Sequence, residues 1–127
     1  MTRRSIHIDS FAHENPIPVA TRIGPFVASG VIPGFDPGSR DMPQELSDQA
    51  ANLFTHIGNA LEAAGAGWDD MAKISFYANH PDARAVVNPF WEKYFPDPES
   101  RPSRHTHITD GGGRPRITCD FIAYVTG

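Results

Sequence analysis

The sequence predicts an α+β protein in which about six strands form a mixed sheet and two helices cover one of its faces. Short apolar runs of β-type residues occur towards both ends of the chain, and a long apolar stripe with helical spacing lies between them. Glycine and proline separate these runs. The 127 residues are expected to form one domain, residues 1–127.

Three short strands are predicted in the N-terminal part. Apolar and polar side chains alternate in residues 4–8, as in a half-buried strand. Residues 19–23 and 26–29 are joined by a Gly-Pro turn, which predicts a hairpin. The proline and glycine pairs between residues 30 and 40 predict a loop.

A long helix is predicted after this loop, with Asp41 as its N-cap and Pro43 in its first turn. Gly65 is expected to end it. Apolar side chains recur at three- and four-residue spacing and form a single stripe that needs a sheet or another helix to cover it. The stripe consists of Leu46, Ala50, Leu53, Phe54, Ile57, Ala60, Leu61 and Ala64.

The next strand is predicted at residues 71–78, so that strand, helix and strand suggest a parallel crossover. Pro89 complicates the second helix, because proline lacks an N–H and clashes with the preceding turn. We therefore expect Asn88 to be the N-cap and Pro89 the first helical residue, with residues 82–87 as a separate turn. Pro96 would stop this helix.

The last two β-rich runs, residues 104–108 and 115–125, flank a triple glycine and predict a hairpin. A hairpin folded symmetrically about Gly112 places Arg104 opposite Asp120. Facing residues have Cβ atoms about 5 Å apart. A guanidinium and a carboxylate are therefore expected side by side on one face of the sheet.

Composition and charge exclude several classes of protein. The formal net charge of −4 gives no attraction for nucleic acid. Cys119 is the only cysteine and cannot form an internal disulfide, which fits a reducing cytoplasm. No apolar run reaches the length of about 18 residues that a membrane helix needs, and no apolar signal core follows the basic N-terminus. A cytoplasmic protein without nucleic-acid or membrane partners is expected.

The predicted arrangement also has a consequence for assembly. If both helices pack on one face, the other face of the sheet stays apolar and open. Such sheets often close by packing against one another around a symmetry axis. We therefore expect an oligomer.

Several local strings occur in a characteristic order and spacing. They are residues 26–30, 59–65, 68–74, 87–88, 94–96, 101–104 and 119–123. Together these strings resemble the RidA/YjgF family of small trimeric enamine and imine deaminases. The resemblance extends from about Asn15 to Val125. It implies a chorismate mutase-like fold and a homotrimer with active sites in clefts between subunits.

The resemblance implies hydrolysis of a short-lived 2-enamino or 2-imino acid to a 2-keto acid and ammonia, without a metal or an organic cofactor. Arg104 matches the family's arginine, and a guanidinium fork suits an anionic substrate's carboxylate. Asp120 stands where typical members carry a glutamate that holds the attacking water. Because aspartate is one methylene shorter, this water would be displaced by roughly 1 Å.

Four further positions correspond to residues of the family's substrate cleft, two of them with a different side chain. Ser29 matches a serine that lines the cleft, although an ordinary strand-end hydroxyl would also explain it. Asn88 matches an asparagine near the substrate, and this role is compatible with helix capping. Thr106 replaces a cysteine and shares the face of Arg104. Ile17 stands where many deaminases have a tyrosine.

Alternatives to this reading remain open. One alternative is a non-catalytic trimeric ligand-binding or protective protein. Another is a deaminase for a different catabolic substrate, such as an aminomuconate-like compound. A purely structural ion pair between Arg104 and Asp120 would also explain these two residues without a role in catalysis. His105 and His107 share the face opposite Arg104 and would need Cys119 as a third metal ligand. We expect no metal, and histidines that pack under helices or face solvent.

Overall fold

The computed structural model describes residues 2–109 and 111–126. Its strands are β1 (Arg3–Ile6), β2 (Ala20–Ile23), β3 (Phe26–Ser29), β4 (Ile32–Pro33), β5 (Met71–Ala78), β6 (Ser103–Ile108) and β7 (Ile117–Tyr124). Its helices are α1 (Leu46–Ala63), the short 3₁₀ turn η1 (Trp68–Asp70) and α2 (Ala83–Tyr94).

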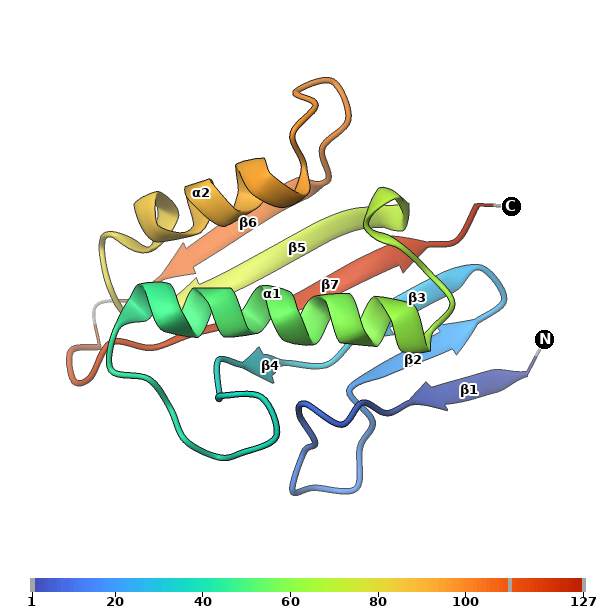
Figure 1. Ribbon diagram of the computed structural model, residues 1–127, viewed down its shortest axis with the longest axis horizontal. Coiled ribbons are helices and arrows are strands. Elements are labelled where there is room, and N and C mark those ends of the chain that lie inside the picture. Colours follow the sequence, from blue (N-terminus) through green and yellow to red (C-terminus); the bar gives the residue numbers. More distant parts are fainter. Residues whose placement is uncertain (1, 110, 127) are drawn as a thin grey trace.

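Within these residues the strands form one mixed sheet of seven strands in the order β1-β2-β3-β7-β5-β6, with β4 also paired to β7. Helices α1 and α2 lie on the same face of this sheet (Figure 1). The predicted α+β class with both helices on one face is confirmed. The loop predicted between residues 30 and 40 contains the two-residue strand β4, which the sequence pattern did not indicate.

The predicted hairpin of the last two strands is wrong, because β5 lies between β6 and β7. Strand β6 pairs with β5 in parallel, and Arg104 lies beside Ile74. Strand β7 pairs with β5 antiparallel, and Asp120 lies beside Ser75. Neighbouring residues of a strand point to opposite faces of the sheet. Arg104 therefore lies on the helix face and Asp120 on the open face, instead of facing each other.

Asn79, directly after β5, holds the connection between β6 and β7 across the end of β5. Its amide Nδ2 donates to the carbonyl oxygens of Gly112 at 3.0 Å and Arg114 at 2.9 Å. Its Oδ1 accepts from the backbone N–H of Arg116 at 2.8 Å. The glycine-rich segment is therefore not a tight hairpin turn but a loop that carries the chain past β5.

Helix α1 begins at Leu46, later than the N-cap predicted at Asp41. The buried side chain of Gln49 explains the extended segment before the helix. Its Nε2 donates to the carbonyl oxygens of Pro43 and Pro115, at 2.9 and 2.8 Å. This fixes Pro43 in an extended segment beside the start of β7. The end of the helix agrees with the prediction, since Gly65 follows it with a φ of 76°.

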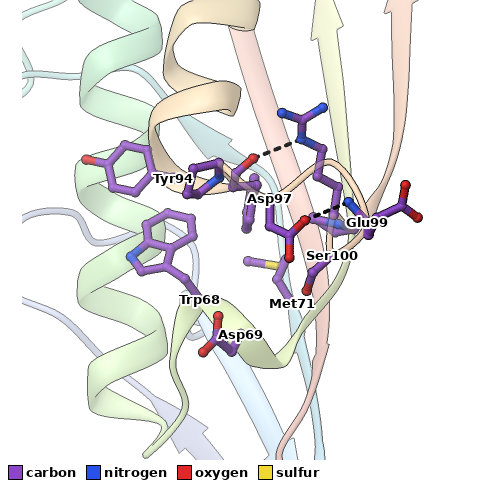
Figure 2. Close-up of a pocket in the computed structure, with 11 residues that line it drawn as sticks. Trp68, Asp69, Met71, Tyr94, Asp97, Glu99 and Ser100 are labelled. Carbon is purple, nitrogen blue, oxygen red and sulfur yellow. Dashed lines mark hydrogen bonds between the residues drawn. The ribbon is translucent and has the colours of Figure 1, made fainter.

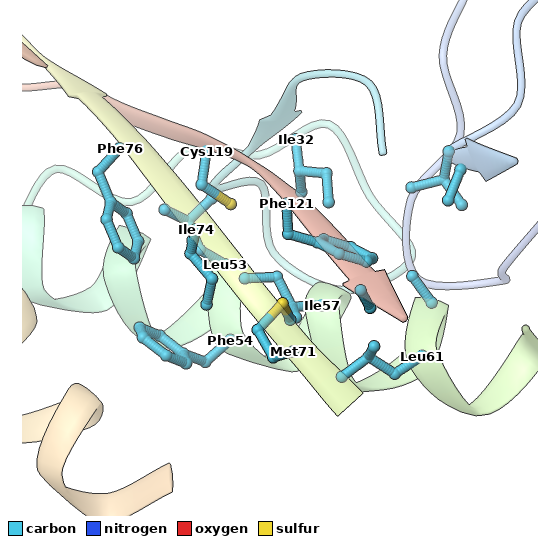
Figure 3. Packing of buried hydrophobic residues seen from close by; sticks show 14 of the residues in the cluster. Ile32, Leu53, Phe54, Ile57, Leu61, Met71, Ile74, Phe76, Cys119 and Phe121 are labelled. Carbon is cyan, nitrogen blue, oxygen red and sulfur yellow. The ribbon is translucent and has the colours of Figure 1, made fainter. Parts of the chain in front are cut away.

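All eight residues of the predicted apolar stripe of α1 are buried. Ile74 and Phe76 of β5 and Cys119 and Phe121 of β7 project from the sheet towards α1 and complete the core (Figure 3). This contact supplies the covering that an amphipathic helix requires.

Helix α2 is continuous across Pro89, so the predicted start at Asn88 is wrong, and Asp82 is the N-cap. The reason is that residues before and after Pro89 in the helix pack against the rest of the protein. Ala83, Val87 and Trp91 are all buried on one side of the helix. Asn88 and Pro89 face solvent, where water can hydrate the carbonyl that lacks a partner. Tertiary contacts thus outweigh the local cost of proline.

The second face of the sheet is open in the single chain, as predicted. Large apolar or aromatic side chains there are 38–54% exposed. They are Ile23, Phe26, Tyr77, Ile122 and Tyr124. Among the residues that the structure describes, no helix has the length and apolar character needed to cross a membrane.

Candidate functional site

Arg104 lies on the edge strand β6, beneath α2. Its guanidinium carbon is 5.1 Å from the ring centroid of Trp91, a cation–π distance. Residues 2–109 and 111–126 place no carboxylate within ion-pair distance of it. Partial burial lowers the pKa of Arg104, and the nearby positive charge of Arg84 lowers this pKa further. Arginine nevertheless stays protonated, so β6 carries a partly desolvated cation.

Arg84 and Thr106 complete a region that we call the arginine corner, formed by Arg84, Arg104, Thr106 and Trp91. Nη2 of Arg84 donates to the carbonyl oxygen of Thr106 at 3.4 Å. Thr106 is 6% exposed, and its hydroxyl Oγ1 has no hydrogen-bond partner in the described part of the chain. Buried hydroxyls are normally paired. The corner thus combines two cations and a free hydroxyl, which suits an anionic ligand.

Asp120 belongs to a second group of side chains on the open face. Its Oδ2 accepts a hydrogen bond of 3.0 Å from the hydroxyl of Tyr77. The Tyr77 ring stacks on His107 with centroids 4.7 Å apart, and His107 lies 3.6 Å from His105. The hydrogen bond to Asp120 raises the pKa of Tyr77, with smaller contributions from burial and from the carboxylate charge. We call Asp120, Tyr77, His107 and His105 the polar row.

Ser29 connects β3 to the backbone next to Asp120. Its Oγ accepts from the N–H of Phe121 at 2.8 Å and donates to the carbonyl oxygen of Gly30 at 2.8 Å. The hydroxyl therefore has a structural role in fixing β7 where Asp120 projects. A role in substrate binding stays a prediction.

The other two predicted site residues lie elsewhere in the chain. Ile17 is 50% exposed and lines a pocket of about 390 Å³ together with Phe11 and His13. Asn88 is exposed on α2 and is not the cap of that helix. A single chain thus brings Arg104 and Thr106 together but does not unite all six predicted residues.

A further pocket of about 340 Å³ lies between η1 and the loop after α2 (Figure 2). Trp68, Asp69, Met71 and Tyr94 line it, with residues 95–97 and 99–102. None of the predicted site residues contributes to its wall. Trp68 contacts Tyr94, with ring centroids 4.4 Å apart. Trp68 is therefore a packing residue as well as part of the pocket wall.

The metal site considered from the sequence cannot form as described. His105 and His107 do share the open face, but Cys119 is fully buried in the core on the helix face. Burial raises the pKa of the Cys119 thiol well above its usual value, so it stays protonated. In the described part of the chain, no three His, Cys, Asp or Glu side chains are grouped to hold a metal ion.

Sequence reasoning missed two residues of these groups, Tyr77 and Arg84. Both stand in segments that the sequence pattern assigns simply to a strand and a turn. Only the pairing of β5 with β7 brings Tyr77 to Asp120, and only the continuous α2 brings Arg84 to Thr106. No local motif would have indicated either contact.

The mixed sheet with two helices on one face is the chorismate mutase-like architecture, and comparisons with solved structures support this class. A putative endoribonuclease of Thermotoga maritima superposes with a TM-score of 0.85 at 21% identity, covering 98% of each chain. RidA of an Antarctic Psychrobacter gives 0.84 at 22% identity, covering 96% of this chain and 99% of that one. The YjgF gene product of E. coli gives 0.82 at 19% identity, covering 95% and 98%.

Sequence comparison then gives the family. The family model described as endoribonuclease L-PSP matches residues 10–108, so the chain belongs to this family, also known as YjgF/RidA. A RutC family protein of Pyrococcus abyssi is 29% identical over 101 residues, which are 74% of this chain and 77% of that protein. The family resemblance stated from the sequence is thereby confirmed.

Proposed function

We propose that the protein hydrolyses a reactive 2-enamino or 2-imino acid to the 2-keto acid and ammonia. The enamine first gains a proton at C3 and loses one from nitrogen, which gives the imine. The oxygen of water then adds to C2 of the imine, and one proton of the water passes to nitrogen. The remaining hydroxyl proton passes to nitrogen as the C–N bond breaks, so that ammonia leaves and the keto oxygen comes from the water. The overall reaction consumes one water, and its steps need no oxidant or reductant.

The observation that carries this proposal is the Arg104 guanidinium, which is partly buried and has no carboxylate partner in the described residues. Desolvated cations in proteins are normally paired. A carboxylate accepts two parallel hydrogen bonds from a guanidinium fork, which makes this pair strong and fixes its orientation. Arg104 would therefore hold the substrate by its carboxylate, beside the face of Trp91.

Asp120 is the proposed residue that positions water and transfers protons. It lies on the face of the sheet opposite Arg104 and is separated from it by β5. One active site that uses both residues therefore needs Arg104 from one chain and Asp120 from another. The exposed apolar side chains of the open face supply a surface for such an assembly, which we propose to be a homotrimer.

The remaining predicted residues would form the walls of this cleft. Thr106 has a hydroxyl free to donate a hydrogen bond. Ile17 is exposed and would give an apolar contact. Ser29 fixes the strand beside Asp120, and Asn88 offers an amide on the exposed side of α2.

A second candidate is a trimer that binds the same kind of anion without turnover. The hydrogen bond from Tyr77 to Asp120 favours it, because this bond occupies part of the short carboxylate that would hold the water. Under this second candidate function, the arginine corner would bind the ligand, and Asp120 would have only a structural role.

A coupled assay separates the two candidates. A serine or threonine dehydratase supplies the enamine, and release of the keto acid is followed with and without the purified protein. The deaminase predicts acceleration that Arg104→Ala abolishes and that Lys93→Ala, a change of an exposed cation on α2, retains. No acceleration at equimolar protein contradicts the deaminase. Acceleration that survives in Arg104→Ala contradicts the clamp. Elution at the mass of one chain, 13.9 kDa, contradicts a site shared between subunits.

A further inference from the structure

We propose that Arg84 gives the site a second anion-binding group, so that the protein selects 2-imino acids that carry a second carboxylate. This inference rests on the proposed function and specifies its substrate class. The ligand would be a 2-imino dicarboxylic acid, with one carboxylate on Arg104 and the other on Arg84.

The first argument is charge. Arg84 is close enough to Arg104 for its positive charge to disfavour the charged form of Arg104. Two like charges near each other are destabilising unless an opposite charge lies between or beside them. The described residues supply no ion pair to either guanidinium. Asp82, the N-cap of α2, has its carboxylate 3.9 Å from His80 instead. An anion from outside the chain would relieve this repulsion.

The second argument is hydrogen bonding. Among the described residues, only one nitrogen of Arg84 is engaged, in a long hydrogen bond of 3.4 Å to the carbonyl oxygen of Thr106. A guanidinium has five N–H donors, so most of its donors are available. The Thr106 hydroxyl, on the same face of β6 as Arg104, is buried and lacks a hydrogen-bond partner among the described residues. The corner therefore has more donors than a single carboxylate can satisfy.

The third argument is position. Arg104 is partly buried beneath α2, whereas Arg84 is exposed in the first turn of that helix. A ligand whose reactive end pairs with Arg104 would direct its remote end towards the exposed Arg84. A short dicarboxylic acid could then pair one carboxylate with the inner cation and the other with the outer cation. A monocarboxylic acid would leave the outer cation without a partner.

The experiment compares two imino acids made in place. D-aspartate oxidase converts D-aspartate to iminosuccinate, and D-amino acid oxidase converts D-alanine to 2-iminopropionate, both with catalase present. Keto-acid release is measured for the wild type, Arg84→Gln, Arg84→Lys and the matched control Lys93→Gln. We expect the wild type to prefer iminosuccinate. The ratio of kcat/KM for the two substrates should fall about tenfold or more in Arg84→Gln, since charge-assisted hydrogen bonds are lost. Arg84→Lys should keep part of the ratio and Lys93→Gln all of it.

Direct binding separates failure of this inference from failure of the proposed function. Calorimetry with succinate and butyrate measures recognition without turnover. Turnover of both imino acids at a ratio that Arg84→Gln does not change overturns the inference and leaves the deaminase intact. If neither imino acid is turned over, the deaminase fails, and calorimetry decides the inference. Succinate binding that Arg84→Gln weakens supports the inference, whereas binding that does not depend on Arg84 overturns it. Thermal unfolding of each variant checks that it is folded.

Discussion

The hydroxyl of Tyr77 donates a hydrogen bond of 3.0 Å to Oδ2 of Asp120 across the pair of strands β5 and β7. The two residues are not directly opposite, since Asp120 pairs with Ser75 and Tyr77 pairs with Thr118. The long tyrosine side chain therefore reaches diagonally to the short carboxylate, as aromatic side chains can in a sheet. The result is a carboxylate with one oxygen held in place by its own chain.

This contact predicts the titration of Tyr77. The hydrogen bond to Asp120 raises the pKa of the phenol above its ordinary value of 10.0. In Asp120→Ala the acceptor and the negative charge are both lost, so the pKa should fall towards 10.0. Absorbance of tyrosinate measures this, and subtraction of a Tyr77→Phe titration isolates Tyr77 from the other two tyrosines. Identical curves for the wild type and Asp120→Ala would contradict the contact.

Gly34, directly after β4, lies so close to α1 that we expect no larger side chain to fit at this position. A Cβ at Gly34 would lie 2.8 Å from both Cβ and the carbonyl oxygen of Gln49. Because backbone atoms are involved, Gly34→Ala should lower the free energy of unfolding by about 2 kcal/mol or more. The matched control is Gly67→Ala, where a Cβ meets nothing within 4 Å and the expected change is within about 0.5 kcal/mol. Urea unfolding measures both, and equal effects would contradict the close approach.

His56 predicts a loss of stability in mild acid. Its Nε2 donates to the carbonyl oxygen of Phe35 at 2.8 Å, and Nδ1 lies 2.9 Å from the hydroxyl of Ser10. A carbonyl can only accept, so neutral His56 carries its proton on Nε2, and Ser10 donates to Nδ1. Burial lowers the pKa of His56 below 6.5, partly opposed by the hydrogen bond to Phe35.

The native state therefore binds fewer protons at His56 than the unfolded state does. This contribution to stability is complete above 6.5, the unfolded pKa, and is lost as the pH falls below it. In His56→Gln the slope of stability against pH in that range should be smaller, by at most about 1.4 kcal/mol per pH unit. Part of the slope should remain in this variant, because the pKa of His13 is also lowered in the folded protein. His7→Gln, at an exposed position, is the control. Thermal unfolding at a series of pH values measures the slopes, and parallel curves for the wild type and His56→Gln would argue against a neutral buried imidazole.

Arg22 predicts a long-range cap of α1. Its Nη1 donates to the carbonyl oxygen of Ala64 at 2.6 Å, and its Nε donates to that of Gly24 at 2.8 Å. The last turn of α1 has no basic residue of its own. Arg22 supplies the positive charge favoured at a helix C-terminus, together with Arg4, whose Nη2 donates to the same carbonyl oxygen of Ala64 over a longer distance of 3.3 Å. Arg22→Ala should lower the free energy of unfolding by about 1–2 kcal/mol. Arg3→Ala, on exposed strand β1, should change it little, and an equal loss in both variants would refute the cap.

The fold was predictable where local periodicity determines it. Strands β3 and β5 and the buried stripe of α1 agree with their predicted residues, because each depends on side chains close in sequence. Helix α2 was not predictable at Pro89, since burial of Trp91 and Val87 against the rest of the protein outweighs the proline. The prediction of a hairpin between β6 and β7 was wrong because contacts distant in sequence decide the strand order. Strand β5 lies between the two strands, and Asn79 holds their connection across its end.

The candidate site was likewise predictable where it depends on local sequence and not where it depends on tertiary contacts. Arg104 and Thr106 share a face by simple alternation along β6, and this part of the prediction is confirmed. The predicted meeting of Arg104 with Asp120 in one chain is wrong, because alternation says nothing about which strand lies between them. Tyr77 and Arg84 came from tertiary contacts alone. The roles of Arg104 and Asp120 in catalysis stay predictions.

The position of β7 also constrains how the chain reaches its native state. This strand comes last in sequence, yet it pairs with β3, β4 and β5 and so joins the two parts of the sheet. Before residues 117–124 are in place, the β1–β3 meander and the β5–α2–β6 unit share no strand ladder. A molecule still being synthesised would therefore hold two incomplete half-sheets with unpaired edges. Such long-range closure is slow and leaves these edges open to wrong pairing until the final strand inserts.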